Sequence, residues 1–167
     1  MRGFNPLEAE VLDAFAVWAE GDPEDQTAAR LARALEQYRT NPWPDPDLMR
    51  DALRLAGHVA ESKPHHVARV SDALALPFAA SLQEQIRRNT ALAVAMNASD
   101  TASTERTVKA LEAFEPWVPW DESFLRERVR IYAGARNPRA LKAAEDFAEW
   151  SAHRPTRLDD LLRPAAD

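Results

Sequence analysis

The sequence predicts an all-α fold of about eight helices, paired as antiparallel hairpins in a short irregular α-solenoid or bundle. Alanine occurs 32 times and leucine 17 times in the 167 residues, whereas valine occurs nine times and isoleucine twice. That balance favours helix over sheet, because β-branched side chains lose rotamer freedom in helices. Five times a capping or turn residue directly precedes a proline at the start of an amphipathic stretch, a pairing typical of helix beginnings: Asn5-Pro6, Asp22-Pro23, Asp45-Pro46, Lys63-Pro64 and Asn137-Pro138.

The first two predicted helices form a hairpin. The first covers residues 6–20, with Asn5 as its cap, and places apolar residues on one face at three- and four-residue spacing, namely Leu7, Val11, Ala14, Phe15 and Trp18. The second covers residues 23–40 and follows the short link Gly21-Asp22, which favours an antiparallel arrangement. Its apolar face consists of Ala28, Leu31, Ala32, Leu35 and Tyr38.

Four helices are predicted for the middle of the chain. The prolines of segment 41–46 exclude regular helix and predict a stiff connection. A third helix over residues 46–62 follows, and a fourth over 64–76 ends near Pro77. The fifth covers 78–96 and is expected to bury Leu82, Ile86, Leu92, Ala93 and Met96. After a turn at 97–104, the sixth is expected to bury Val108, Leu111 and Phe114.

The last predicted hairpin joins helices over residues 121–136 and 138–153. The first is expected to bury Leu125, Val129 and Tyr132, and the second Leu141, Ala144, Phe147 and Ala148. A short final helix is predicted over 156–163. Because 167 residues are one domain's worth, we expect a single helical domain over residues 1–167, with hairpins at about 6–40, 46–76, 78–115 and 121–153.

Composition argues against several classes of protein. The formal net charge of −6 argues against coating nucleic acid, since that affinity comes chiefly from cations on phosphates. The chain has no cysteine, which excludes disulfides and thiolate metal sites. The longest apolar run, residues 73–80, is far shorter than the roughly 20 residues of a membrane span. No secretory signal is visible, so we expect a cytoplasmic, soluble protein.

Catalytic and cofactor sites are not indicated by the motifs. His58, Glu61 and His65 are the conceivable metal ligands, but Pro64 breaks the helix between them. The paired carboxylates cluster at predicted helix starts, where the helix dipole favours negative charge. Seven serines occur without the glycines of a nucleophile elbow, and four glycines are too few for a phosphate-binding loop. We therefore expect no catalytic residue, no metal site and no cofactor.

Arginine and tryptophan side chains are the candidate contact residues. Arg126 and Arg130 lie one helical turn apart in an arginine-rich stretch, where they either pair with neighbouring glutamates on a solvated face, face an acidic protein or contact nucleic acid. Arg87-Arg88 leaves the same three interpretations open. Trp43, Trp117 and Trp120 lie in proline-rich connections, and such a residue either plugs the end of a helical bundle or serves as a binding hot spot.

Residues 124–155 resemble one tetratricopeptide-type helical hairpin. The similarity comprises Tyr132 near the end of the first helix, Asn137-Pro138 at the turn, the small residues Ala140, Ala144 and Ala148, and a closing Pro155. Leu141 and Glu145 depart from the usual small and aromatic residues. Residues 11–42 repeat the outline with Trp18, Asp22-Pro23 and Pro42. In that family the repeats bind peptides or partner proteins and perform no catalysis.

A second resemblance covers residues 120–147, which are similar to helical appendages following the synthase part of some bacterial membrane-fused spermidine synthase-like proteins. Together the observations predict a non-enzymatic protein–protein interaction or scaffold module of helical-repeat type. Its partner is another protein or another domain, contacted through Trp43, Trp117, Trp120, Arg126 and Arg130. The alternatives are an accessory subunit or appended domain of a larger enzyme or nucleic-acid complex, and a metal-dependent enzyme using His58, Glu61 and His65.

Overall fold

The computed structural model describes residues 6–21, 26–98 and 102–153. Within these ranges the chain forms eight α-helices and two short 3-10 helices and contains no strand, which confirms the predicted all-α class. Backbone contacts divide the chain into two compact units, Met1–Glu115 and Pro116–Asp167, called unit 1 and unit 2 from here on. The expected single domain stays a prediction, while the Asn5 cap, Asp22-Pro23 and the helix over 156–163 fall outside the described residues.

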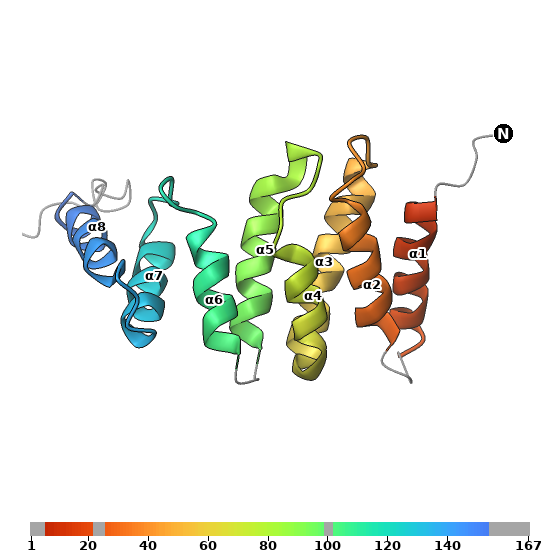
Figure 1. Cartoon of the computed structure of the whole chain (residues 1–167), viewed down its shortest axis with the longest axis horizontal. Coiled ribbons are helices and arrows are strands. Elements are labelled where there is room, and N and C mark those ends of the chain that lie inside the picture. The colour runs from red at the N-terminus through yellow and green to blue at the C-terminus, as the bar shows by residue number, and fades with distance from the viewer. Residues whose placement is uncertain (1–5, 22–25, 99–101, 154–167) are drawn as a thin grey trace, which may run out of the picture. The chain divides into compact units, whose positions relative to one another are not determined.

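Unit 1 contains six α-helices that run from α1 at one end to α6 at the other, with α3 and α4 overlapping in the view of Figure 1. Helix α1 packs against α2, α2 against α4, and α3 against α5, while α5 also contacts α4 and α6. Their bounds are α1 Pro6–Ala19, α2 Gln26–Gln37, α3 Pro46–Ser62, α4 Val67–Leu74, α5 Glu84–Asn97 and α6 Ser103–Glu112.

Helix α3 begins and ends at the predicted residues. Its start is specified by the residues of its first turn. Asp45 has extended backbone, and its Oδ1 accepts hydrogen bonds from the amides of Asp47 and Leu48 at 2.9 and 3.0 Å. Pro46 then occupies the first helical position, where its missing amide is not needed. The last turn ends at Ser62, before the 3-10 helix η1 (Pro64–His66) leads into α4.

The core of unit 1 consists of buried residues of α1 to α5 together with Tyr38 and Phe78. The predicted faces of the first two helices supply Leu7, Val11, Ala14, Ala28, Leu31, Ala32, Leu35 and Tyr38. Phe15 and Trp18 are partly buried and pack against this core. Its fully buried members are mostly aliphatic, which gives close packing without polar groups to satisfy, and include Val11, Leu31, Leu35, Met49, Leu53, Val59, Val70 and Leu74.

The connection between α4 and α5 differs from the prediction. A helix was expected from Phe78, but residues 75–80 form a loop, the 3-10 helix η2 covers Ser81–Gln83, and α5 starts at Glu84. The Phe78 side chain is buried, and its ring packs on that of Tyr38 with centroids 5.4 Å apart. The amide of Ala79 donates to the Tyr38 carbonyl at 2.9 Å. These contacts hold the segment as a loop against the end of α2.

The buried face of α5 is also not the predicted one. Leu92 is buried as expected, but Leu82, Ile86, Ala93 and Met96 are exposed. The other buried residues of α5 are Arg87, Ala91, Val94 and Ala95. Arg87 accounts for the rotation, because its guanidinium donates to both oxygens of Glu84 and to the Leu74 carbonyl, which keeps this side of α5 against α4.

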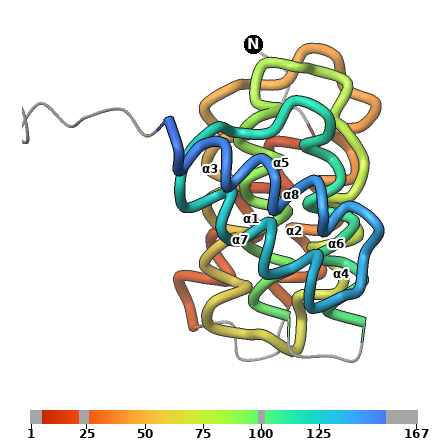
Figure 2. The backbone as a smooth tube through the Cα atoms, turned by 90° about the vertical axis from the view of Figure 1, so that its left-hand side faces the viewer, coloured from red at the N-terminus to blue at the C-terminus, as the bar shows by residue number. Residues whose placement is uncertain are grey.

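Unit 2 contains the hairpin of α7 (Glu122–Gly134) and α8 (Ala140–Ala152), which pack against each other (Figure 2). Asp121 caps α7 by accepting a hydrogen bond from the Phe124 amide at 2.9 Å. At the other end, Arg136 adopts a left-handed backbone with φ 53°. The Arg136 and Asn137 amides donate to the Ala133 and Tyr132 carbonyls, the pattern of a Schellman cap. Helix α7 therefore ends at Gly134, before the predicted Arg136.

Helix α8 buries a different face from the predicted one. Leu141 is 72% exposed, and Ala144 and Ala148 are exposed as well, whereas Ala143 and Asp146 are buried. The physical reason is the carboxylate of Asp146, which binds Arg128 of α7 between the two helices. The buried members of α7 include the predicted Leu125 and Tyr132 together with Arg128 and Ile131.

Candidate partner-binding surfaces

The loop tryptophans lie on the protein surface. Trp43 is 88% exposed, Trp117 is 86% exposed and Trp120 is 51% exposed, so none of the three plugs a helical bundle. The loop around Trp43 has a defined turn, in which the Trp43 amide donates to Oδ1 of Asn41 at 3.0 Å. The flanking prolines restrict the backbone further. Large aromatic side chains are therefore presented to solvent from stiff connections.

Arg126 and Arg130 of α7 are exposed but paired within the helix. Arg126 forms an ion pair with Glu122, and its guanidinium carbon lies 6.0 Å from the centroid of the Phe147 ring. Nε of Arg130 donates to Oε2 of Glu127 at 2.9 Å. That hydrogen bond, with the charge of Arg130, holds the pKa of Glu127 below its ordinary range. Exposed pairs of this kind stabilise a fold little, so a partner carboxylate can replace the helix's own.

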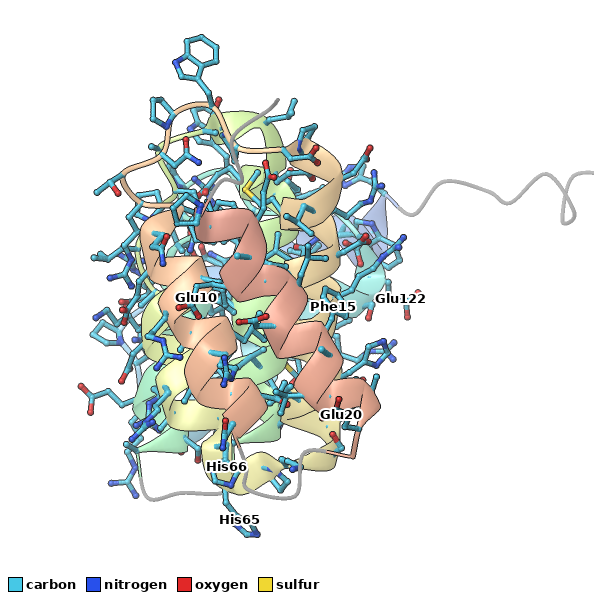
Figure 3. The ribbon with its side chains drawn as sticks, turned by 90° about the vertical axis from the view of Figure 1, so that its right-hand side faces the viewer. Glu10, Phe15, Glu20, His65, His66 and Glu122 are labelled. Atoms are coloured by element: carbon cyan, nitrogen blue, oxygen red, sulfur yellow. The ribbon has the colours of Figure 1, made fainter. Side chains whose placement is uncertain are left out.

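The candidate ligands His58, Glu61 and His65 do not form a metal site in the part of the chain that the structure describes. Nδ1 of His58 lies 3.9 Å from Oε2 of Glu61, and both side chains are mostly exposed. His65 belongs to η1 and projects away from the protein (Figure 3). Across residues 6–21, 26–98 and 102–153, no group of three or more histidine or acidic side chains is arranged to hold a metal ion.

Sequence reasoning missed the interhelical ion pair of unit 2. Nη1 of Arg128 donates to Oδ2 of Asp146 at 2.6 Å, and Nζ of Lys142 lies 2.7 Å from the other carboxylate oxygen. Burial alone raises the pKa of Asp146, but the hydrogen bonds and charges of Lys142 and Arg128 outweigh it, so the pKa lies below the ordinary value. The pair joins residues 18 positions apart, and no local spacing rule connects them.

Sequence reasoning also missed a cavity in unit 1. It has a volume of about 240 Å³ and is lined by residues of α4, α5 and α6 and of the segments that follow α4 and flank α6. Arg87 and Arg88 line it from α5, and Arg106 and Lys109 line it from α6. The doublet Arg87-Arg88 was visible in the sequence, but only the folded chain brings it to α6.

None of the helices in the described ranges is both long and apolar enough to cross a membrane. Comparisons with protein-family models, with curated proteins and with solved structures find no significant match for this chain. The resemblance to a tetratricopeptide-type hairpin therefore stays a prediction.

Proposed function

We propose that this chain is a non-enzymatic binding module that holds another protein, or another part of a larger polypeptide. The observation that carries the proposal is the exposure of Trp43 and Trp117 at 88% and 86%. An indole ring left in water forgoes a large burial energy, and binding hot spots are enriched in tryptophan because they recover it on association. The stiff proline-flanked loops reduce the entropy that would be lost when a partner binds.

Affinity capture followed by reconstitution tests this function. The purified chain is used to capture partners, and each candidate is then purified and mixed with the chain in sedimentation experiments. We expect the wild type to form the complex. Trp43→Ala, or Trp117→Ala combined with Trp120→Ala, should raise the dissociation constant at least tenfold, which corresponds to about 1.4 kcal/mol of binding free energy. Testing the two tryptophan groups separately shows which unit carries the contact.

The matched control is Leu141→Ala, because Leu141 is also a large exposed apolar side chain but lies on α8 and in no proline-rich loop. It should bind each partner as the wild type does. Equal binding by the wild type and by all tryptophan variants would refute the proposed contact surface, provided that circular dichroism shows all variants to be folded.

A further inference from the structure

The solvent-facing side of α5 carries no charged residue. Its exposed positions are Gln85, Ile86, Asn89, Ala93, Met96 and Asn97. Within the described ranges every other α-helix exposes at least one charged side chain, although α5 belongs to a chain in which 29% of the residues are charged. Charged residues are depleted from the centre of protein–protein interfaces. The face of α5 therefore has the composition of an interface.

The apolar residues of this face have the spacing of a coiled-coil seam. Alternating steps of four and three residues connect five positions, called the α5 seam from here on: Leu82 of η2, followed by Ile86, Asn89, Ala93 and Met96. This is the a/d spacing with which one helix packs along another. Leu82 is 72% exposed, Met96 43% and Ile86 37%. The other sides of α5 pack against α3, α4 and α6, so the seam is open to an external partner.

Asn89 indicates which partner fits the α5 seam. Its Oδ1 accepts a hydrogen bond from Nε2 of Gln85 at 3.3 Å, and its amide hydrogens face solvent. Once covered, this carboxamide must find a polar partner among apolar residues. The Asn89 of a second copy supplies one, because a carboxamide is both donor and acceptor and so complements itself. An asparagine within such a seam is a known determinant of register and oligomeric state.

Electrostatics favours the same occupant. The chain has a formal net charge of −6, so two copies repel each other over most relative orientations. That repulsion is smallest where neither copy brings a charged side chain to the contact, as on the α5 seam. A partner recognised by its own charge would find no counter-charge there.

We propose that two copies of this chain associate through the α5 seam, about a two-fold axis that passes close to Asn89. Because Asn89 is the middle residue of the five, this axis lets the whole seam of one copy overlap that of the other. The seam is about 20 Å long, which is short for a standard interface, so we expect a dissociation constant of roughly 1–100 µM. The inference goes beyond the proposed function and uses none of the loop tryptophans.

Sedimentation equilibrium of the full chain, from about 5 µM to about 1 mM, measures this association. Ala93→Glu should raise the dissociation constant at least tenfold, because it brings a charge into the seam without removing a buried side chain. The matched control is Ala16→Glu, which changes an exposed alanine of α1 in the same way. The control should change the dissociation constant less than about threefold. Circular dichroism should show both variants to be folded.

A pair of charged variants tests the position of the axis. Asn89→Asp and Asn89→Lys should each weaken self-association at least tenfold, because like charges then meet at the axis. An equimolar mixture of the two should regain a dissociation constant within about tenfold of the wild type, since opposite charges then face each other.

Three results would overturn the inference: a wild type that is monomeric at about 1 mM, equal effects of Ala93→Glu and Ala16→Glu, or a mixture of the Asn89 variants that does not associate. A monomeric wild type whose captured partner is lost with Ala93→Glu would assign the α5 seam to another protein instead. Capture through Trp43 or Trp117 is measured separately, so its failure would remove the proposed function and leave this inference standing.

Discussion

Replacing Asp146 with alanine should destabilise the α7–α8 hairpin more than any other single change to its charged residues. The side chains of Arg128 and Asp146 are only 2% and 9% exposed, and Nη1 and Oδ2 are 2.6 Å apart. A guanidinium stays charged under all practical conditions. The variant therefore keeps a buried positive charge after removing the carboxylate that neutralises it.

The size of the effect follows from this burial. Removing one member of a buried ion pair costs about 3–5 kcal/mol, whereas replacing both members with apolar side chains of similar volume is often neutral or stabilising. We therefore expect Asp146→Ala to lower the free energy of unfolding by about 3–5 kcal/mol. Arg128→Met combined with Asp146→Leu should bring the stability of the hairpin back to within about 1 kcal/mol of the wild type.

Hydrogen exchange measured by mass spectrometry on peptides from α7 and α8 gives the opening free energy of the hairpin itself, and urea unfolding of the full chain gives the global value. Lys142→Gln is the control, because Lys142 contacts the same carboxylate from a largely exposed position. It should have a much smaller effect. The reasoning fails if Asp146→Ala and Lys142→Gln cost the same, or if the apolar double variant is no more stable than Asp146→Ala.

Four further changes test other parts of the fold. Tyr38→Phe should leave the free energy of unfolding unchanged or higher in urea titrations, because the buried hydroxyl has no hydrogen-bond partner among the described residues and burial already raises its pKa. Asp45→Ala should lower the free energy of unfolding by about 1 kcal/mol, since two amides of α3 lose their acceptor, and unchanged urea midpoints would contradict that role. Arg136→Gly should raise the free energy of unfolding by about 1 kcal/mol, because glycine adopts the left-handed backbone at lower cost. The thermal midpoint should rise accordingly. The pKa values of Glu84 and Asp146 are lowered by folding, so the stability that these carboxylates contribute is complete only above about pH 5 and is lost as pH falls towards the folded values. An acid titration followed by circular dichroism should show a shallower loss for Asp146→Asn.

Capping residues and prolines predicted the helix ends that are determined by residues next to them in the sequence. Asp45 and Pro46 specify the start of α3 within four residues of chain, and the structure begins the helix there. Phe78 shows where such rules stop. It follows Pro77 and looks like the first residue of a helix, but its ring is buried against Tyr38, 40 positions earlier. Only tertiary packing decides whether Phe78 starts a helix or lies in a buried loop.

The faces of α5 and α8 were mispredicted for one shared reason. Hydrophobic periodicity assigns leucine and methionine to the interior and charged residues to the surface. In both helices a charged residue is inside. Arg87 of α5 pairs with Glu84 one turn earlier and donates to the Leu74 carbonyl of α4, and Asp146 of α8 pairs with Arg128 of α7. The cavity was missed for a different reason, since its lining residues come from α4, α5, α6 and the adjoining segments, which only the folded chain brings together. The proline-rich context singled out Trp43, Trp117 and Trp120 but left open whether they plug a bundle or lie on the surface, and only the structure shows that they are exposed.

The hydrogen bond from the Ala79 amide to the Tyr38 carbonyl has an implication for how this chain can be altered. In a linear array of repeats, one hairpin can be deleted or duplicated because each contacts only its neighbours. Here the segment that leaves α4 is anchored to the end of α2, and α2 packs directly on α4. Both contacts join neighbouring parts of unit 1, so a shortened or lengthened version must keep residues that can replace Tyr38, Phe78 and Ala79 at each junction.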